Sequence, residues 1–350
     1  MKTYNNLFDK ICSFQNLHLA YLKARKCKRY RNEILRFSYN LEANLTNLQK
    51  ELSNQTYQHG SYREFIVYDL KKRHIKTAPF RDRVVHHALC NIIEPIFNKG
   101  FIFDSYACLE KKGTHKAIKR LEIFLKSISV SAKRTLDERK IYCLQCDISK
   151  YFNSIDHQIL FNLLKKKIAD KKTLWLIKKI LDSSYDKKLG VGIPIGNLTS
   201  QLFANIYLNE LDQFIKHKLH LRYYLRYMDD FLILGFGKKK LHGTKVQIRE
   251  FLKNQLRLKL HSKKANIFPA NKGINFLGYW SFGNYRLLRK TTIKRFIKRM
   301  KKYQKMLNKK VLSKGKFNNS LQSWTTYTNF ANSYKLIKIL SNELKVNLIK

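Results

Sequence analysis

The stretch Tyr223–Gly235 reads YYLRYMDDFLILG and places two adjacent carboxylates, Asp229 and Asp230, between two apolar runs rich in β-forming residues. This pattern predicts a strand, a tight turn and a returning strand. Acidic residues are scarce elsewhere, because the chain holds 24 Asp and Glu against 71 Lys and Arg. Two like charges this close repel each other unless one takes up a proton or a divalent cation neutralises them. We therefore expect a metal site at this turn.

The composition indicates a globular protein with a polyanionic partner. With 350 residues and 44% hydrophobic content, the chain can bury a sizeable core in two or three substructures. A formal net charge of +47 opposes compaction, so nucleic acid is the expected partner. The range 251–342 contains no acidic residue at all. A membrane-surface protein is the alternative, but the aromatic residues are spread along the chain rather than gathered on one helix face.

The cysteines and the N-terminus predict a cytoplasmic, reducing location with no membrane partner. Six cysteines are scattered through the chain, the N-terminus has no apolar signal core, and no apolar run approaches the ~20 residues of a membrane span. Cys143 and Cys146 form a C-x-x-C, but no second Cys or His pair follows at zinc-finger spacing. We expect them to be buried strand cysteines.

The flanking segments alternate between expected strands, loops and helices. Residues 1–60 show helical apolar spacing and predict an extension that packs on the body or contacts nucleic acid. Alternating residues around 62–68 predict a strand, followed by basic residues and a helix from near Asp82; a strand-like piece is expected at Phe101. We further expect a basic loop over 235–243, a hairpin over 266–280 that turns near 271–273, and a basic helical end with an inward apolar stripe.

A third carboxylate, Asp147, ends the apolar run that begins at Ile141. Alone it could be a helix cap or a turn former. It can join Asp229 and Asp230 only if the two strands are neighbours in one sheet. Such a trio suits two Mg²⁺ ions about 3.5–4 Å apart, with Mn²⁺ as a substitute, which stabilise both oxygens of an in-line phosphoryl displacement. Asp147 and Asp229 are the expected primary ligands and Asp230 the secondary one, because successive strand side chains point to opposite faces.

Five motifs occur in an order that resembles a reverse transcriptase. They are D-x-x-x-x-F at 147–152, P-x-G-x-x-x-S at 194–200, Y-M-D-D at 227–230, a lysine at Lys264, and F-L-G-Y at 276–279. The resemblance covers about 62–279 and is weaker beyond. It implies an α+β fold of the right-hand polymerase type, with fingers, a palm of antiparallel sheet plus helices, and a basic helical thumb.

The resemblance also implies roles for individual residues. The metal-binding and catalytic residues would be Asp147, Asp229 and Asp230, with the backbone of Ile148 as a further metal contact. Phe152 would lie under the sugar and reject a 2′-hydroxyl. The nucleotide-binding residues would be Lys72, Arg73, Phe152, Ile195, Gly196, Gln201 and Lys264, and the primer grip Phe276, Leu277, Gly278 and Tyr279. From the residues alone, the basic ones could equally form a solvated face, and Phe152 could be a core residue.

The nucleotide-pocket motif departs from the form that many reverse transcriptases have. Ile195 and Gln201 stand where Gln and Pro are common, and the form I-G-N-L-T-S-Q is similar to the reverse transcriptases of diversity-generating retroelements. That resemblance implies a bacterial or phage-encoded protein and synthesis that is error-prone at template adenines, with a small basic accessory variability protein, possibly oligomeric, as a partner. An apolar Ile195 cannot make the hydrogen bonds of a glutamine amide, which predicts a looser check of base-pair geometry.

The predicted function is RNA-directed DNA synthesis from a primer 3′ end, with an RNA template, a DNA or RNA primer and dNTPs as partners. The predicted divisions are an N-terminal extension at 1–60, fingers at 61–145, palm at 146–283 and thumb at 284–350. One alternative is a group II intron-like or retron-like bacterial enzyme, for which the short stretch after Tyr279 leaves little room for maturase segments. The other is a non-catalytic basic RNA-binding protein, which gives no reason for Y-M-D-D.

Overall fold

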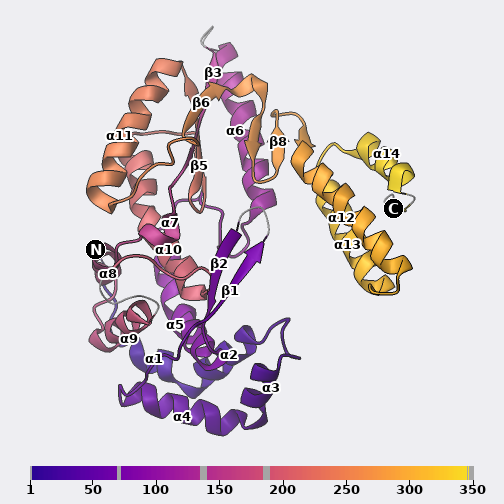
Figure 1. Ribbon diagram of the computed structural model, residues 1–350. Coiled ribbons are helices and arrows are strands. Elements are labelled where there is room, and N and C mark those ends of the chain that lie inside the picture. The colour runs from indigo at the N-terminus through magenta and orange to yellow at the C-terminus, as the bar shows by residue number, and fades with distance from the viewer. Residues whose placement is uncertain (1, 69–71, 135–139, 184–189, 345, 347–350) are drawn as a thin grey trace. The chain divides into compact units, whose positions relative to one another are not determined.

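The computed structural model describes residues 2–68, 72–134, 140–183, 190–344 and 346, and for 72 and 132–134 the backbone alone. The chain divides into two compact units. The first comprises 1–108, 147–221 and 246–264, and the second 109–146, 222–245 and 265–350. The predicted α+β character is confirmed, since both units carry helices and antiparallel strand pairs (Figure 1).

The first unit begins with short helices that pack around one long helix. These are α1 (Phe8–Cys12), α2 (Phe14–Ala24), α3 (Asn32–Tyr39), α4 (Leu41–Ser53) and the long α5 (Phe80–Asn98). All four contact α5 or one another, and their apolar residues, such as Leu17, Leu45 and Leu89, are fully buried. Apolar burial of this kind, rather than helix propensity, is what stabilises helices as short as these.

An exposed two-stranded ribbon and a second helical group complete the first unit. Strands β1 (Arg63–Tyr68) and β2 (Lys72–Thr77) pair antiparallel, and every residue of β1 is exposed. The helices are α7 (Tyr151–Ser154), α8 (His157–Lys165), α9 (Lys171–Asp182) and α10 (Leu198–Gln213), which continues into a π-helical turn at Phe214–Lys218. Asp156 and Asp170 cap α8 and α9 by accepting backbone N–H bonds. The central run 202–208 of α10 is buried on all sides.

The second unit is built on a four-stranded sheet. Its order is β4-β5-β3-β6, formed by β4 (Tyr224–Tyr227), β5 (Asp230–Phe236), β3 (Ile141–Asp147) and β6 (Asn266–Pro269). Helix α6 (Thr114–Arg134) contacts β4 and β5. Helix α11 (Lys238–Leu256) follows β5 and runs from the second unit into the first. The sheet core is apolar, with Leu144, Phe231 and Ile233 at 0% exposure.

A small sheet and three helices form the remainder of the second unit. Strands β7 (Ile274–Phe276), β8 (Tyr279–Ser281) and β9 (Arg286–Leu288) pair antiparallel, and a short 3-10 turn at Ala270–Lys272 precedes them. Helices α12 (Lys290–Asn308), α13 (Lys314–Thr328) and α14 (Tyr334–Leu344) follow. Phe296 and Met300 of the predicted apolar stripe are buried, and Phe296 stacks on Trp324 with ring centroids 4.0 Å apart.

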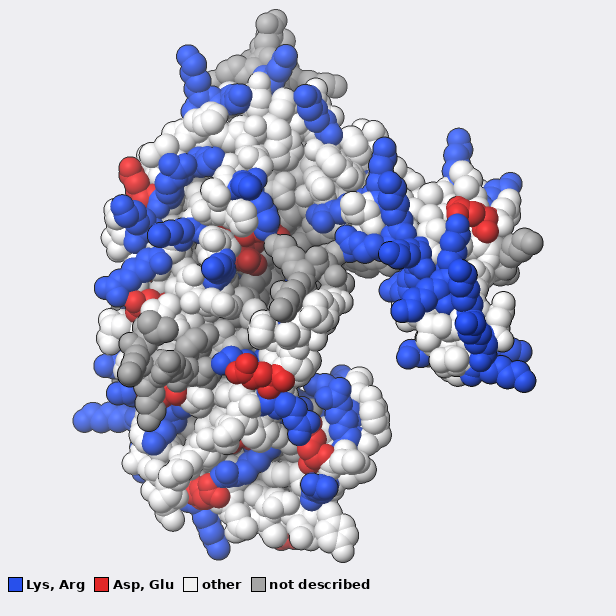
Figure 2. Space-filling view, in the orientation of Figure 1, with Lys and Arg blue, Asp and Glu red and all other residues white. Residues whose placement is uncertain are grey.

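Basic side chains cover the solvent face of α12. Eight Lys and Arg side chains of this helix are exposed: Lys290, Lys294, Arg295, Lys298, Arg299, Lys301, Lys302 and Lys305. In Figure 2 this helix presents a nearly continuous blue surface. The segregation follows from the helical period, which turns the apolar stripe inward and leaves the lysines and arginines in water.

Three local predictions were wrong. The expected hairpin over 266–280 is two elements, because β6 pairs with β3 of the large sheet and the actual hairpin is β7–β8, turning at 277–278. The expected loop over 235–243 is helical from Lys238, since lysine is a good helix former and Gly237, with φ +75°, already ends the strand. The strand-like piece at Phe101 pairs with no strand of the described residues and forms turns instead.

Candidate active site

The aspartate pair lies at a two-residue turn, as predicted. Tyr227 pairs with Asp230, so Met228 and Asp229 form the turn between β4 and β5. Met228 has φ +56°, a left-handed conformation that such a turn normally assigns to glycine. Strain of this kind costs about 1–3 kcal/mol and is concentrated at functional sites. Asp229 therefore leaves the backbone within the turn and Asp230 from the first residue of a strand, so the two carboxylates are not equivalent.

A buried arginine, which the sequence reasoning missed, supports this turn. Arg226 is 0% exposed and is the largest wholly buried side chain of the described residues. Its Nη1 donates a hydrogen bond of 3.1 Å to the backbone oxygen of Met228. A guanidinium is costly to bury without partners. The signal was present in the sequence as one arginine inside the apolar run before Y-M-D-D.

Asp147 is the last residue of β3, and β3 is the hydrogen-bonded neighbour of β5 in the sheet. The topological condition for the three aspartates to share a site is therefore met. The carboxylate of Asp147 forms an ion pair with Nζ of Lys264, and the two side chains are 13% and 39% exposed. A backbone bond of 2.8 Å from His261 N to Asp147 O holds the lysine's segment beside the strand end. Lys264, predicted near a triphosphate, thus contacts a predicted metal ligand directly.

The donor set suits Mg²⁺ in kind. Across the described residues, no three His, Cys, Asp or Glu side chains lie together as a ready-made metal group. Carboxylate and backbone oxygens are nevertheless the hard donors that Mg²⁺ takes, usually one or two per ion with water and phosphate completing the shell. The ammonium of Lys264 on Asp147 shows that this carboxylate attracts a cation. The role of Asp147, Ile148, Asp229 and Asp230 as metal ligands remains a prediction.

Backbone hydrogen bonds join the predicted nucleotide-pocket motif to two other segments of the first unit. Ile193 N donates to the carbonyl of Phe152 at 2.8 Å, and Lys76 N donates to the carbonyl of Ile195 at 3.2 Å. Gly196 has φ +130°, and a Cβ at this position would lie 2.9 Å from the backbone oxygen of Lys76. The motif therefore joins strand β2 to the segment that carries Phe152, and only glycine fits at its tightest contact.

The other predicted nucleotide-binding residues lie on these same elements. Phe152, on α7, is partly exposed rather than a core residue, and its ring meets Tyr151 edge-on at 5.6 Å. Gln201 is partly exposed on the first turns of α10. Arg73 is exposed on β2; Lys72 belongs to the same strand, but its side chain lies outside the description. Their assignment to a nucleotide remains a prediction.

The predicted primer grip, 276–279, forms the tight β7–β8 turn of the second unit. Leu277 and Gly278 have φ of +47° and +98°, which is the two-residue turn that matches strand twist. Tyr327, from α13, donates a 3.0 Å hydrogen bond to the carbonyl of Gly278, and Tyr279 donates one of 3.1 Å to the carbonyl of Tyr327. Sequence reasoning missed Tyr327, because nothing local distinguishes it from other tyrosines.

The expectations about cysteines and membrane spans can also be compared with the structure. Cys143 and Cys146 are fully buried on β3, as predicted, and burial raises the pKa of the Cys143 thiol. None of the helices within the described ranges is long and apolar enough to cross a membrane.

Comparison with known proteins gives the family. A sequence model of the family "Reverse transcriptase (RNA-dependent DNA polymerase)" matches residues 43–281, more than half of the chain. Protein YkfC of Escherichia coli is 26% identical over 261 residues, covering 63% of this chain and 64% of the relative. The group II intron-encoded protein LtrA of Lactococcus lactis is 26% identical over 326 residues, covering 73% of this chain and 51% of the relative.

The fold comparison agrees with the sequence match. The chain spans between about half and just under two thirds of the length of these curated relatives. A structure of apo telomerase from Candida tropicalis, truncated from its C-terminal domain, has a TM-score of 0.50 at 11% identity, covering 69% of this chain and 59% of that one. This chain therefore belongs to the reverse transcriptase (RNA-dependent DNA polymerase) family.

Proposed function

We propose that the chain is an RNA-directed DNA polymerase that adds deoxynucleotides to a primer 3′ end. The observation that carries this proposal is the paired-aspartate turn of β4–β5 on a strand that neighbours β3, which ends at Asp147. A non-catalytic RNA-binding protein would have no use for carboxylates gathered in a chain of net charge +47. The family match over 43–281 supports the same reading.

In this proposal the three aspartates hold the metal ions. When bound, two Mg²⁺ ions would stabilise the attacking and leaving oxygens of an in-line displacement. The turn at Met228 and the buried Arg226 keep Asp229 and Asp230 oriented before substrate arrives. Lys264 pairs with Asp147 in this structure, and with a cation bound at Asp147 its ammonium would be available to the substrate phosphates.

The pocket residues would select the nucleotide. Phe152 lies against the sugar in this proposal and rejects a 2′-hydroxyl by steric contact. Arg73, exposed on β2, provides a forked guanidinium for phosphate oxygens. Because the Ile193–Phe152 and Lys76–Ile195 hydrogen bonds fix the loop between these elements, the pocket is formed before the nucleotide binds.

The proposed partners are an RNA template, a primer and dNTPs. The basic face of α12 suits the phosphate backbone of a template–primer duplex, to which exposed lysines and arginines contribute salt-dependent affinity. We propose that the synthesis takes place in the cytoplasm of a bacterial cell; two similar proteins, YkfC and LtrA, come from the bacteria E. coli and L. lactis. A small basic accessory protein would have to share the nucleic acid with this chain, since both are cationic.

Primer extension tests this function. The purified chain, an RNA template with annealed primer, dNTPs and Mg²⁺ should give extended products, and Asp229→Asn should give none. Asp9→Asn, which removes an exposed carboxylate far along the sequence from the motifs, serves as the matched control and should extend normally. Extension by Asp229→Asn at the wild-type rate, or no extension by wild type with varied primers, would overturn the proposal.

The finer assignment has two candidates. Ile195 and Gln201 favour the diversity-generating type, in which adenines are copied with frequent errors. The similarity to the group II intron-encoded protein LtrA favours the intron type. Sequencing cDNA made by wild type and by Ile195→Gln separates them: errors concentrated at template adenines, and reduced in the variant, support the first. Uniform errors that the variant leaves unchanged support the second.

A further inference from the structure

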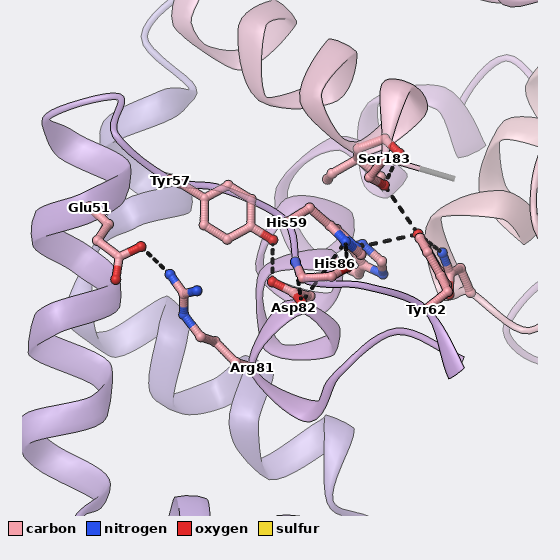
Figure 3. A network of polar contacts seen from close by, with 11 residues as sticks. Glu51, Tyr57, His59, Tyr62, Arg81, Asp82, His86 and Ser183 are labelled. Atoms are coloured by element: carbon pink, nitrogen blue, oxygen red, sulfur yellow. Dashed lines mark hydrogen bonds and ion pairs between the residues drawn. The ribbon is translucent and has the colours of Figure 1, made fainter. Parts of the chain in front are cut away.

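A polar network in the first unit includes Tyr57, His59, Tyr62, Asp82 and His86, and no role for it follows from the reaction itself (Figure 3). It begins at Tyr57, which is 0% exposed and donates a 2.6 Å hydrogen bond to Oδ1 of Asp82 on α5. The other oxygen of Asp82 accepts from Gly60 N at 3.1 Å, so this carboxylate fixes the segment 57–60. The side chains of His59 and Asp82 are each only 2% exposed.

Two histidines extend the network. His59 Nδ1 lies 2.7 Å from the carbonyl of Gly60, which can only accept, so Nδ1 carries a proton. His59 Nε2 lies 3.2 Å from His86 Nε2, so one of these two nitrogens donates to the other. His86 is 1% exposed, its Nδ1 has no partner among the described residues, and burial lowers its pKa well below the usual value. Burial therefore keeps the His86 ring neutral.

Tyr62 joins the histidines to the pocket motif. Its hydroxyl oxygen lies 3.3 Å from His59 Nε2 and 3.3 Å from Ser183 Oγ. Ser183 donates its own proton to the carbonyl of Ile180 at 2.7 Å, so Ser183 presents an acceptor to the tyrosine proton. The same Tyr62 oxygen accepts a 2.8 Å hydrogen bond from Nδ2 of Asn197. The Tyr62 hydroxyl thus accepts from Asn197 and can donate to Ser183.

Asn197 is the residue that connects this network to the pocket. It is 2% exposed and directly follows Ile195 and Gly196, at the N-cap position of α10. An asparagine there ordinarily accepts a backbone N–H bond of the helix, but the Asn197 side chain makes no such cap. Its amide instead donates to Tyr62. This indicates that the Asn197 side chain fixes the position of the loop rather than the end of the helix.

We propose that Tyr62 is a positioning residue for the nucleotide pocket, acting through Asn197 to hold Ile195 and Gly196 against strand β2. The proposal rests on the function given above and identifies a residue outside the reverse transcriptase motifs. Without the Tyr62 hydroxyl, the buried amide of Asn197 loses its hydrogen-bond acceptor. The loop that carries Ile195 and Gly196 then shifts so that this amide can reach another acceptor. The Lys76–Ile195 hydrogen bond, which the loop position sets, weakens with it.

The experiment compares two tyrosine variants of the same network. Tyr62→Phe should raise KM for dNTP about fivefold or more, with kcat and primer–template affinity near wild type, because the loop must be ordered on binding. Tyr57→Phe removes an equally buried hydroxyl at the other end, bonded to Asp82 instead of the loop. It should lower thermal stability and leave KM unchanged.

Two further measurements separate positioning from general destabilisation. If Tyr62 acts through Asn197, Tyr62→Phe combined with Asn197→Ala should raise KM no more than the larger single change. Hydrogen exchange of the backbone amides in 190–201, measured on the protein without substrate, should be faster in Tyr62→Phe and unchanged in Tyr57→Phe. Hydrogen exchange requires no polymerase activity. It therefore tests the positioning role of Tyr62 even if the chain proves not to be a polymerase. Unchanged exchange, additive KM effects or equal KM shifts in both tyrosine variants would each overturn the proposal.

Discussion

Replacing Gly196 with alanine tests how closely the pocket loop is fitted to strand β2. The added Cβ would lie 2.9 Å from the oxygen of Lys76 and 3.3 Å from Cγ2 of Ile75. The first neighbour is backbone, and the Lys76 N–Ile195 O hydrogen bond couples any shift of that backbone to the loop. The residue also has φ +130°, which a side chain disfavours.

The magnitude follows from these two penalties. A disfavoured backbone conformation costs about 1–3 kcal/mol, and overpacking a close contact costs about 1–3 kcal/mol more. The loop can escape most of this by moving away from β2, so the cost falls on nucleotide binding rather than on global stability. If nucleotide binding must bring the loop back to β2 at a cost of even about 1.4 kcal/mol, kcat/KM for dNTP falls about tenfold.

The assay is steady-state primer extension over a range of dNTP concentrations, with thermal unfolding as the companion measurement. Gly190→Ala is the matched control, since Gly190 belongs to the same loop and also has positive φ, +54°, but a Cβ there meets no described atom within 4 Å. We expect a tenfold or larger loss for Gly196→Ala and a much smaller one for the control. Equal losses in the two variants would refute the steric argument.

Two other predictions concern stability. The pKa of His87 is lowered to about 4 from 6.5, by burial first and then by neighbouring basic groups. The unfolded chain therefore binds a proton between pH 6.5 and 4 that the folded chain does not. The free energy of unfolding consequently decreases as the pH is lowered from 6.5 to 4, and His87→Gln should reduce that decrease in thermal melts. Arg226→Met removes the donor to Met228 O and should cost about 1–3 kcal/mol, lowering Tm by several degrees together with activity; an unchanged Tm would contradict the support assigned to Arg226.

The sequence predicted the elements whose signals are local. The turn at Asp229 follows from two strand-forming runs only two residues apart, and the buried Cys143 from its apolar run. Pairing between distant segments carries no such signal. Strand β6 was assigned to the wrong partner because its pairing with β3, more than a hundred positions earlier, depends on the tertiary fold.

The supporting residues of the site were missed for a related reason. Tyr62, Tyr327 and Arg226 act through hydrogen bonds of their polar atoms with backbone or amide groups of distant or turn residues, and such bonds leave no periodicity in the sequence. Nothing in the local sequence distinguishes Tyr62 and Tyr327 from the other tyrosines of the chain, which has 20 in all. The motif residues, in contrast, were recognised through their order along the chain.

The exposed ribbon β1–β2 has a consequence for motion. Phe65, Ile66 and Val67 are 46%, 38% and 39% exposed, so little apolar burial stabilises this pair of strands. A two-stranded ribbon without a core is marginally stable in water. Its hydrogen bonds should therefore open and close many times during the lifetime of the folded protein, most often toward the Tyr68–Lys72 end, since the Lys76–Ile195 hydrogen bond holds the other end. Arg73, carried on β2, should sample a range of positions, whereas Tyr62, just before β1, stays anchored by its buried partners.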